Sequence, residues 1–231
     1  MPADADVLAR ALASADPLTW VLTGDSITHG VVHTQGARTY AEHLHAIVRG
    51  ELGRVDDAVI DTAISGWRVV QLLEQFDRRV ATWNPQIVTL MIGTNDCSDA
   101  GVFPVITPEE FGSSVAEFVR RVRGIGAIPV LLTPPVIDVA NAPERARIAA
   151  FAQAIRDVAA TEETVLVDQF ARFTELGNGR VPWGLLNDPF HPNAAGHEAL
   201  ALELATVLGL DPEGSRVLPK LRAGVAAARL D

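Results

Sequence analysis

The sequence predicts an α/β protein, a three-layer α/β/α sandwich built around a five-stranded parallel sheet. Short apolar runs alternate with amphipathic stretches along the chain, and every connection is long enough to hold a helix. The apolar run at residues 87–92 is the strongest strand signal, and it is typical of a strand that is covered on both faces. Repeated units of this kind predict parallel strands joined by helical crossovers.

Strands are predicted at residues 20–22, 58–64, 87–92, 128–133 and 164–167. Apolar residues at helical spacing predict helices at residues 39–50, 69–80 and 148–158, and further helices after Thr107 and Asn193. The helix after Thr107 begins with a capping box and a proline, and its predicted buried face is Phe111, Val115, Phe118, Val119 and Val122. The apolar positions of the helix after Asn193 are Leu200, Leu204, Val207 and Leu208. Residues 1–16 are a predicted lead-in helix, residues 212–231 a C-terminal amphipathic helix, and residues 172–187 a long irregular loop.

Composition and charge are those of a globular chain with one domain spanning residues 1–231. Hydrophobic residues make up 48% and charged residues 21%, which excludes extensive disorder. The formal net charge of -10 argues against nucleic acid or an anionic membrane as a partner. Since the N-terminus lacks signal-peptide features, no apolar stretch approaches a membrane span and Cys97 is the single cysteine, a cytoplasmic location is expected.

The turn Thr23-Gly24-Asp25-Ser26 follows the first predicted strand, and the candidate site is organised around it. A strand that stops at a glycine leaves the next residues on a loop, here at the edge where open α/β sheets bind ligands. Ser26 is therefore either a helix cap or a nucleophile. For a serine taken alone, the cap is the commoner role.

Three other loops carry residue types that acyl transfer requires. Gly66 offers a backbone amide with no Cβ in the way, and the carboxamide of Asn95 offers neutral donors, so that with the Ser26 amide they make a candidate oxyanion hole. The alternative for Asn95 is a turn residue. Asp188 stands three residues before His191, where it can bond one ring nitrogen and fix the tautomer that a general base needs.

With these blocks in this order, the chain resembles the GDSL, or SGNH, hydrolase family, named for its shared Ser, Gly, Asn and His residues. The matching blocks are Gly24-Asp25-Ser26, Gly66, Gly93-Thr94-Asn95-Asp96, and Asp188 with His191. The resemblance implies a flavodoxin-like fold and a serine ester hydrolase that needs no metal and no cofactor. It implies that Ser26, Asp188 and His191 are catalytic, and that Ser26, Gly66 and Asn95 form the oxyanion hole. Ile27 replaces the leucine of many members, a like-for-like apolar change.

The motif Gly-Asp-Ser-Ile-Thr-x-Gly is most similar to the motifs of family branches that contain carbohydrate esterases and small acyl-ester hydrolases. It implies a small-molecule ester as substrate, with acetyl or another short acyl group on a sugar or other polar acceptor. Apolar and aromatic residues on the surrounding loops predict a small pocket, and these are Trp67, Phe103, Val136 and Trp183. Arg68 either binds an acidic substrate or pairs on the surface.

Two alternative functions remain open: a thioesterase or lipase-like acylhydrolase that uses the same site, and a module that binds a polar ligand without catalysis.

A metal site is also conceivable at His29, His33, His43 and His45. The sequence holds no cysteine pair and no His-Glu-x-x-His, so solvated or locally bonded histidines are expected instead. Cys97 is expected to be inert, and Asp25 and Asp96 to hold their loops through bonds to the backbone.

Overall fold

The computed structural model describes residues 4–228. At its centre lies a sheet of five strands, β1 (Thr19–Gly24), β2 (Ala58–Asp61), β3 (Ile87–Met91), β4 (Ile128–Leu132) and β5 (Val165–Val167). The strands are parallel and lie in the order β2-β1-β3-β4-β5. This is the flavodoxin-like order. The predicted fold class is therefore confirmed.

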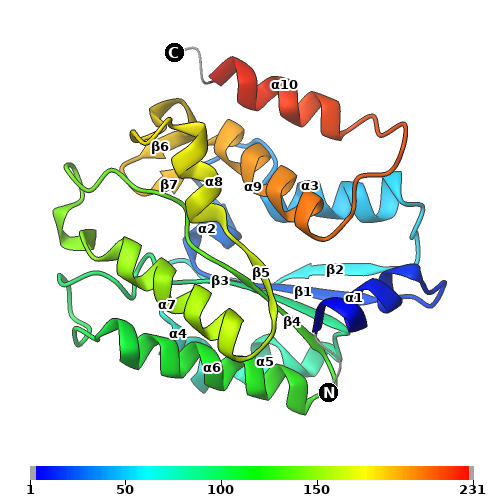
Figure 1. The fold of residues 1–231 in the computed structure, drawn as a ribbon, viewed down its shortest axis with the longest axis horizontal. Helices are drawn as coiled ribbons and strands as arrows, with labels where there is room; N and C mark the ends of the chain where they lie inside the picture. Colours follow the sequence, from blue (N-terminus) through cyan, green and yellow to red (C-terminus); the bar gives the residue numbers. More distant parts are fainter. Residues whose placement is uncertain (1–3, 229–231) are drawn as a thin grey trace.

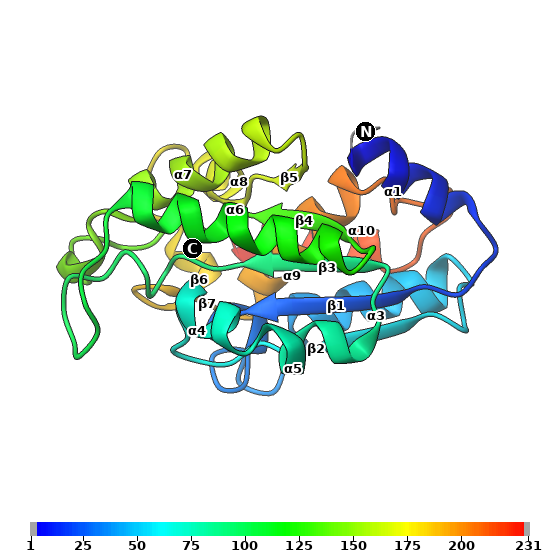
Figure 2. The same ribbon diagram turned by 90° about the horizontal axis from the view of Figure 1, so that it is seen from below.

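Helices cover both faces of the sheet, as Figure 1 and Figure 2 show. One layer consists of α4 (Val69–Glu74), α5 (Phe76–Arg79), α6 (Pro108–Gly124) and α7 (Ile148–Thr161). The opposite layer contains α1 (Asp4–Ala13), α3 (Tyr40–His45), the π-helical turn η1 (Ala46–Glu51) and α9 (Ala194–Val207). The last helix, α10 (Leu218–Ala228), packs on α9.

Shorter elements complete the fold between these helices and strands. Two are helices, α2 (Ser26–His29) and α8 (Gln169–Leu176), and three are single 3-10 turns, η2 (Ala81–Trp83), η3 (Pro143–Arg145) and η4 (Trp183–Leu185). An antiparallel pair, β6 (Leu186–Asp188) and β7 (His191–Pro192), forms a small hairpin beside α2.

Two hydrophobic clusters, one on each face of the sheet, hold the layers together. Trp20 and Leu22 of β1 belong to the cluster under α3 and α9, whereas Val21 belongs to the cluster under α4 to α7. This alternation is the period of two expected of a strand covered on both sides. The buried face of α6 is the predicted one, and Thr107 and Glu110 form the predicted capping box at its start.

Residues 172–187 do not form the predicted long irregular loop. Helix α8 occupies the beginning of this range, and η4 and β6 occupy its end. The buried residues of α8 are Gln169, Phe173 and Leu176, with the N-cap at Asp168. Their helical spacing starts before Arg172 and includes a polar residue, so an apolar pattern sought within 172–187 misses it.

Smaller differences concern the helices. The segment predicted as one helix at 39–50 changes to a π-helical turn after His45, and the segment at 69–80 is divided at Gln75 into α4 and α5. Val207, predicted for the apolar face of α9, is exposed. The predicted terminal helices contain α1 and α10, while their outermost residues, 1–3 and 229–231, lie outside the described part. Across residues 4–228, no helix has both the length and the apolar character that a membrane crossing requires.

The parallel register brings the candidate loops to one edge of the sheet. Leu22 pairs with Asp61 and Gly24 pairs with Met91, so β1, β2 and β3 end at the same level. Gly24 has φ of 152°, and a Cβ there would lie 2.0 Å from the Met91 carbonyl oxygen. Only glycine therefore allows β1 to end this close to β3 before the chain turns into α2.

Candidate active site

Ser26 is the first residue of α2 and follows β1 after a single intervening residue. The N-cap of this helix is Asp25, whose Oδ1 accepts a hydrogen bond from the Ile27 amide at 3.0 Å. The capping role that the sequence left open for Ser26 thus belongs to its neighbour. The Ser26 hydroxyl lies instead 2.9 Å from His191 Nε2, in a position with 7% of the residue exposed.

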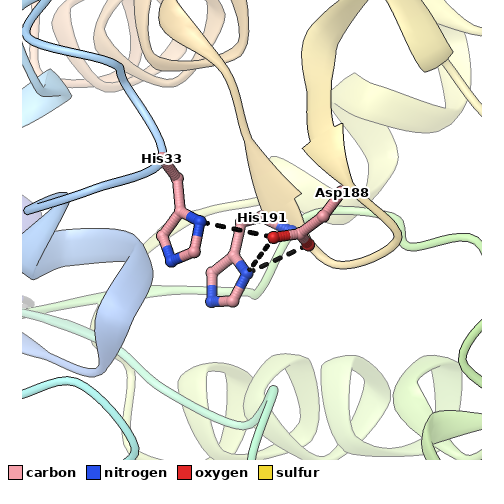
Figure 3. Close-up of side chains that lie close together, drawn as sticks. All are labelled: His33, Asp188 and His191. Carbon is pink, nitrogen blue, oxygen red and sulfur yellow. Dashed lines mark hydrogen bonds and ion pairs between the residues drawn. The ribbon is translucent and has the colours of Figure 1, made fainter.

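Asp188 and His191 face each other across the β6–β7 hairpin (Figure 3). His191 Nδ1 lies 2.8 Å from Asp188 Oδ2 and 3.0 Å from Oδ1. The backbone amides of Phe190 and His191 also donate to Oδ1, at 3.0 and 2.9 Å, and hold the carboxylate in place. Because a carboxylate only accepts, His191 carries its proton on Nδ1, and Nε2 is left as the acceptor that faces Ser26.

The electrostatic environment keeps the imidazole neutral and the carboxyl ionised. Burial lowers the pKa of His191 below 6.5; Asp188 opposes this shift, and the charges of His33 and Arg145 add to it. Burial alone would raise the pKa of Asp188, but hydrogen bonds from the Phe190 amide and from His191 outweigh it and keep that pKa below 3.8. At neutral pH His191 is therefore an unprotonated base beside an anion.

The loops after β2 and β3 are bonded to each other, which brings Gly66 and Asn95 to the same edge. Asn95 Nδ2 donates to the Trp67 carbonyl oxygen at 3.1 Å, and the Val69 amide donates to Asp96 Oδ1 at 2.9 Å. Gly66 has φ of 82°, yet a Cβ there would meet no atom within 4 Å. The backbone conformation, rather than a close neighbour, is thus what favours glycine at this position.

Asp25, the N-cap of α2, and Asp96, in the loop after β3, are both buried. Each accepts the backbone bond described above, so the expected bonds to the backbone are present. Burial raises the pKa of each carboxyl to about 7. Cys97 is also buried, and burial raises the pKa of its thiol to about 12. A thiol with such a pKa is protonated at neutral pH, in agreement with the inert role expected for it.

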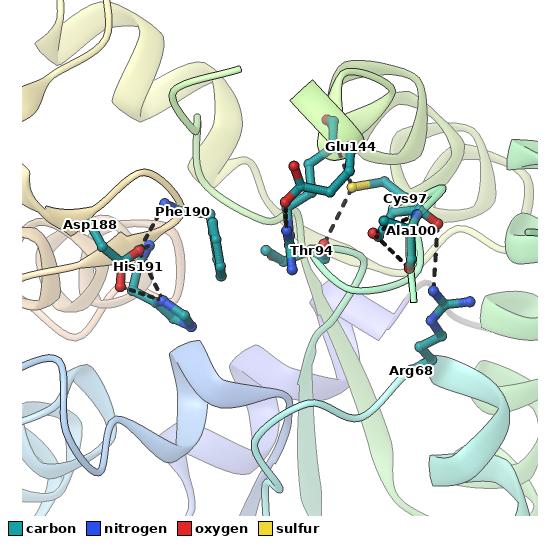
Figure 4. A network of polar contacts seen from close by, with 10 residues as sticks. Arg68, Thr94, Cys97, Ala100, Glu144, Asp188, Phe190 and His191 are labelled. Atoms are coloured by element: carbon teal, nitrogen blue, oxygen red, sulfur yellow. Dashed lines mark hydrogen bonds and ion pairs between the residues drawn. The ribbon is translucent and has the colours of Figure 1, made fainter. Parts of the chain in front are cut away.

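Arg68 is not a surface ion-pair partner, which was one of the two roles considered from the sequence. The residue is buried, with 4% exposed, and its guanidinium donates to the Pro104 carbonyl oxygen at 2.8 Å and to the Ser98 carbonyl oxygen at 3.5 Å. Figure 4 shows Arg68 beside the loop that contains Cys97 and Ala100. Its guanidinium also lies 5.0 Å above the ring of Phe103. Surface pairing was therefore wrong, because the positive charge instead holds the loop after β3 by its carbonyl groups.

The other predicted pocket residues divide into two groups. Trp67 and Val136 are half-buried, and the Asp138 amide, two residues after Val136, donates to the Pro189 carbonyl oxygen at 2.7 Å, so this loop borders the hairpin. Trp183 is 49% exposed and lines a hollow with Leu176 and Ala228. Within residues 4–228, that hollow is lined by none of the four blocks.

The four histidines considered as a metal site do not converge. His29 Nδ1 accepts from the Ser65 amide at 3.3 Å, and His45 Nε2 lies 3.3 Å from an arginine of the same helical segment. His33 lies against Asp188 and His191, and these three are the one group of possible metal ligands found within the described residues. His29 is therefore bonded locally, as expected for it.

Sequence reasoning missed three residues that surround His191. His33 stacks on its ring, the Phe190 ring lies 4.5 Å from it between centroids, and the Arg145 guanidinium lies 3.8 Å above Phe190. Only Phe190 had a signal in the sequence, its place beside His191. His33 and Arg145 reach the site from the loop after α2 and from η3, and no spacing rule connects those segments to the hairpin.

A flavodoxin-like sheet with these four loops at one edge is the arrangement of the SGNH hydrolases. The chain belongs to the GDSL-like lipase/acylhydrolase family, whose model matches residues 22–199 and so includes all four blocks. It is therefore a carboxylic ester hydrolase.

Known relatives agree with this family over nearly the whole chain. An acetylxylan esterase of Geobacillus stearothermophilus is 24% identical over 219 residues, which cover 89% of this chain and 99% of the esterase. Among solved structures, LAE5, an alpha/beta hydrolase enzyme from the metagenome of Lake Arreo in Spain, has a TM-score of 0.73 and 26% identity, and the match covers 87% of this chain and 100% of LAE5. Axe2, an acetylxylan esterase from Geobacillus stearothermophilus, has a TM-score of 0.72 and 22% identity over 83% and 94% of the two chains, and so has a similar fold.

Proposed function

We propose that this chain hydrolyses short-chain carboxylic esters, acetyl esters above all, on a carbohydrate or another polar acceptor, through an acyl-enzyme on Ser26. The observation that carries the proposal is the continuous connection from Ser26 Oγ to His191 Nε2 at 2.9 Å and from His191 Nδ1 to Asp188 at 2.8 Å. A nucleophile, a base and an orienting carboxylate within hydrogen-bond reach are what acyl transfer by a serine requires.

In the first half of the reaction, Ser26 Oγ attacks the acyl carbon while its proton passes to His191 Nε2. The carbonyl oxygen becomes an oxyanion, which receives hydrogen bonds from the amides of Ser26 and Gly66 and from the Asn95 carboxamide. Asp188 stabilises the imidazolium through Nδ1. When the ester C–O bond breaks, His191 returns the proton to the departing alcohol, and the acyl group stays on Ser26.

In the second half, water replaces the alcohol. His191 removes a proton from the water, the resulting hydroxide attacks the acyl carbon, and the same donors hold the second oxyanion. The bond to Ser26 Oγ then breaks, the serine regains its proton from His191, and the free acid leaves. The proposed role of His191 as base in both halves agrees with burial that keeps it neutral at rest.

Support for a short acyl group comes from the residues beside the site and from the relatives. Trp67 follows Gly66 directly, and the loop that contains Val136 borders the hairpin, so both are proposed as walls of a small acyl pocket. A relative that matches most of this chain is an acetylxylan esterase, and solved forms of that enzyme include two described as catalytic mutants. A thioesterase or a lipase-like acylhydrolase would use the same residues on a different substrate.

The test is to identify the residue that a fluorophosphonate labels, by mass spectrometry of peptides. The expected adduct is on Ser26, and Ser26→Ala is expected to lose both labelling and ester hydrolysis while it keeps its fold. Ser65→Ala is a matched control, because Ser65 Oγ also lies beside a histidine, 3.1 Å from His29 Nδ1, and this variant is expected to keep both. Labelling at Ser65, or hydrolysis by Ser26→Ala, would overturn the mechanism.

A further inference from the structure

His33 lies against the Asp188–His191 pair, although it comes from a different segment of the chain (Figure 3). Its ring is parallel to that of His191, with 3.5 Å between centroids and 6° between planes. Its Nδ1 lies 3.3 Å from Asp188 Oδ2. Two imidazoles thus share one carboxylate, and the ring that the mechanism uses is covered on one face by a second titratable ring.

The loop that contains His33 is fastened at two points. Thr34 Oγ1 donates to the Gly30 carbonyl oxygen at 3.4 Å, at the end of α2. Gln35 Nε2 donates to Asn187 Oδ1 at 3.0 Å, on the strand that contains Asp188. The stacking of His33 is therefore supported by bonds from the two residues that follow it and does not depend on the ring contact alone.

The Nδ1 atom of His33 faces two groups with opposite requirements. Asp188 Oδ2 accepts hydrogen bonds, whereas Asn187 Nδ2, 3.5 Å from the same nitrogen, donates them. A His33 ring with its proton on Nε2 accepts from Asn187, and a ring with a proton on Nδ1 donates to Asp188. Protonation of His33 therefore makes it a second donor to the carboxylate that orients His191.

The ring geometry favours this shared carboxylate over a metal centre. His33, Asp188 and His191 offer ligand atoms within 4.8 Å of one another. A zinc ion requires the lone pairs of both imidazoles, which lie in the ring planes, to meet at one point. Rings that are 6° from parallel and 3.5 Å apart hold those lone pairs in two planes that do not meet there.

Few other charges face this pair. Asp188 on β6 is the anion, and Arg145 on η3 is the cation that affects His191, with its own charge offset by Glu144. His197 on α9 is buried, and burial lowers its pKa to about 3, so it is uncharged between about pH 5 and pH 8.

We propose that His33 is a positioning residue of this esterase: as a neutral ring it holds His191 and Asp188 in place, and once protonated it opposes the positive charge that His191 gains during the reaction. The inference rests on the proposed function, because it requires His191 to act as the base. A positive charge on His33, 3.5 Å away, disfavours the imidazolium form of His191. A proton on His33 Nδ1 also makes His33 compete with His191 for the Asp188 carboxylate. Protonation of either ring therefore lowers turnover.

The consequence is measurable in the acid limb of the pH profile. Because the two positive charges repel, the first proton to bind either ring already lowers turnover, and the fall in log kcat/KM has its midpoint at a higher pH than His191 alone would give. His33→Phe keeps an aromatic ring for stacking and cannot titrate or bond Asp188. His33→Gln keeps a donor and removes the ring and the charge.

The experiment measures kcat and KM for a chromogenic acetyl ester between about pH 5 and pH 8. Wild type and the control His45→Gln, which changes an exposed histidine on α3, are expected to share one midpoint of kcat/KM, and both His33 variants are expected to have a midpoint at lower pH. At the alkaline end, His33→Phe is expected to keep a kcat within about threefold of wild type, and His33→Gln to lose about tenfold in kcat with KM unchanged, since the stack is lost.

The possible failures are distinguishable. If both His33 variants match wild type in midpoint and in kcat while Ser26→Ala is inactive, the role of His33 is overturned and the proposed function stands. A midpoint that stays at the wild-type pH in both variants overturns that role even if kcat falls. Hydrolysis by Ser26→Ala would overturn the proposed function itself, whatever the His33 variants do.

Discussion

Replacement of Asn95 by alanine tests whether its carboxamide stabilises the oxyanion or only holds a turn. Both roles place the residue on the loop after β3, so position does not separate them. In the proposed mechanism the donor bonds strongly only after negative charge has developed on the substrate oxygen. Its loss is therefore expected to lower kcat and to leave KM little changed.

The structure allows the loss of kcat and the loss of stability to be estimated separately. Removal of one oxyanion donor costs on the order of 10²–10³ in kcat, about 3–4 kcal/mol. The substitution also removes the hydrogen bond from Asn95 Nδ2 to the Trp67 carbonyl oxygen, 3.1 Å long. Such a neutral bond contributes about 1 kcal/mol to stability, which corresponds to a Tm decrease of about 2–4 °C in a chain of this size. A small thermal change with a large loss of kcat is thus expected.

The assay measures kcat, KM and Tm on one purified sample with a chromogenic acetyl ester. Thr107→Ala is the matched control, because it removes one comparable bond, from the Glu110 amide at 3.2 Å, and costs about 1 kcal/mol without a change in any of the four blocks. Its Tm is expected to fall by a similar amount with kcat unchanged. If Asn95→Ala is folded and its kcat matches that of Thr107→Ala, Asn95 has no part in the chemistry.

Four further predictions follow from the site. Because burial lowers the pKa of His191 below 6.5, the midpoint of kcat/KM in His33→Phe, where His191 is the one titratable ring of the pair, is expected below pH 6.5, and a midpoint above 6.5 would contradict this. Since the proposed steps use no metal, dialysis against EDTA is expected to leave the rate unchanged; a loss that zinc restores would refute them. Acetyl to butyryl esters are expected to have higher kcat/KM than long-chain esters in a series of chromogenic substrates, whereas a steady increase towards dodecanoyl would indicate a lipase. Burial raises the pKa of Asp96 from 3.8 to about 7, so the folded state keeps a proton that the unfolded state releases, and this contribution to stability is lost as the pH rises through about 7. Asp96→Asn cannot ionise, so its Tm relative to wild type is expected to increase from about pH 5 to about pH 8; a difference that does not vary with pH would contradict the cause.

The sequence was most informative where a residue pattern acts locally. The capping box at Thr107 and the apolar spacing of α6 depend only on neighbours within one helix, and both are confirmed. The ends of β1 and β3 were also predicted within a residue or two, because glycine follows an apolar run in each. A parallel sheet then brings Ser26 and Asn95 to one edge without any knowledge of side-chain contacts.

Prediction failed where a role depends on residues distant in the chain. Arg68 follows the second block, but its partners are carbonyl groups of a loop 30 and 36 residues away. His33 reaches Asp188 from a loop whose path depends on the bond between Gln35 and Asn187. Neither contact leaves a periodic or compositional trace, and α8 was missed because a buried glutamine interrupts its apolar face.

The bonds among the four loops explain why the Asn95 experiment depends on kcat and KM rather than on activity alone. His29 bonds Ser65, Asn95 bonds the carbonyl group of Trp67, and Asp96 bonds the amide of Val69. These contacts make α2 and the loops after β2 and β3 one bonded unit, which provides a route by which a loop that moves in a variant would displace groups in the others. A displaced Gly66 amide would alter substrate binding as well as the chemical step, and the effects of two such substitutions would not add. Selective loss of kcat is therefore the result that separates a missing donor from a moved loop.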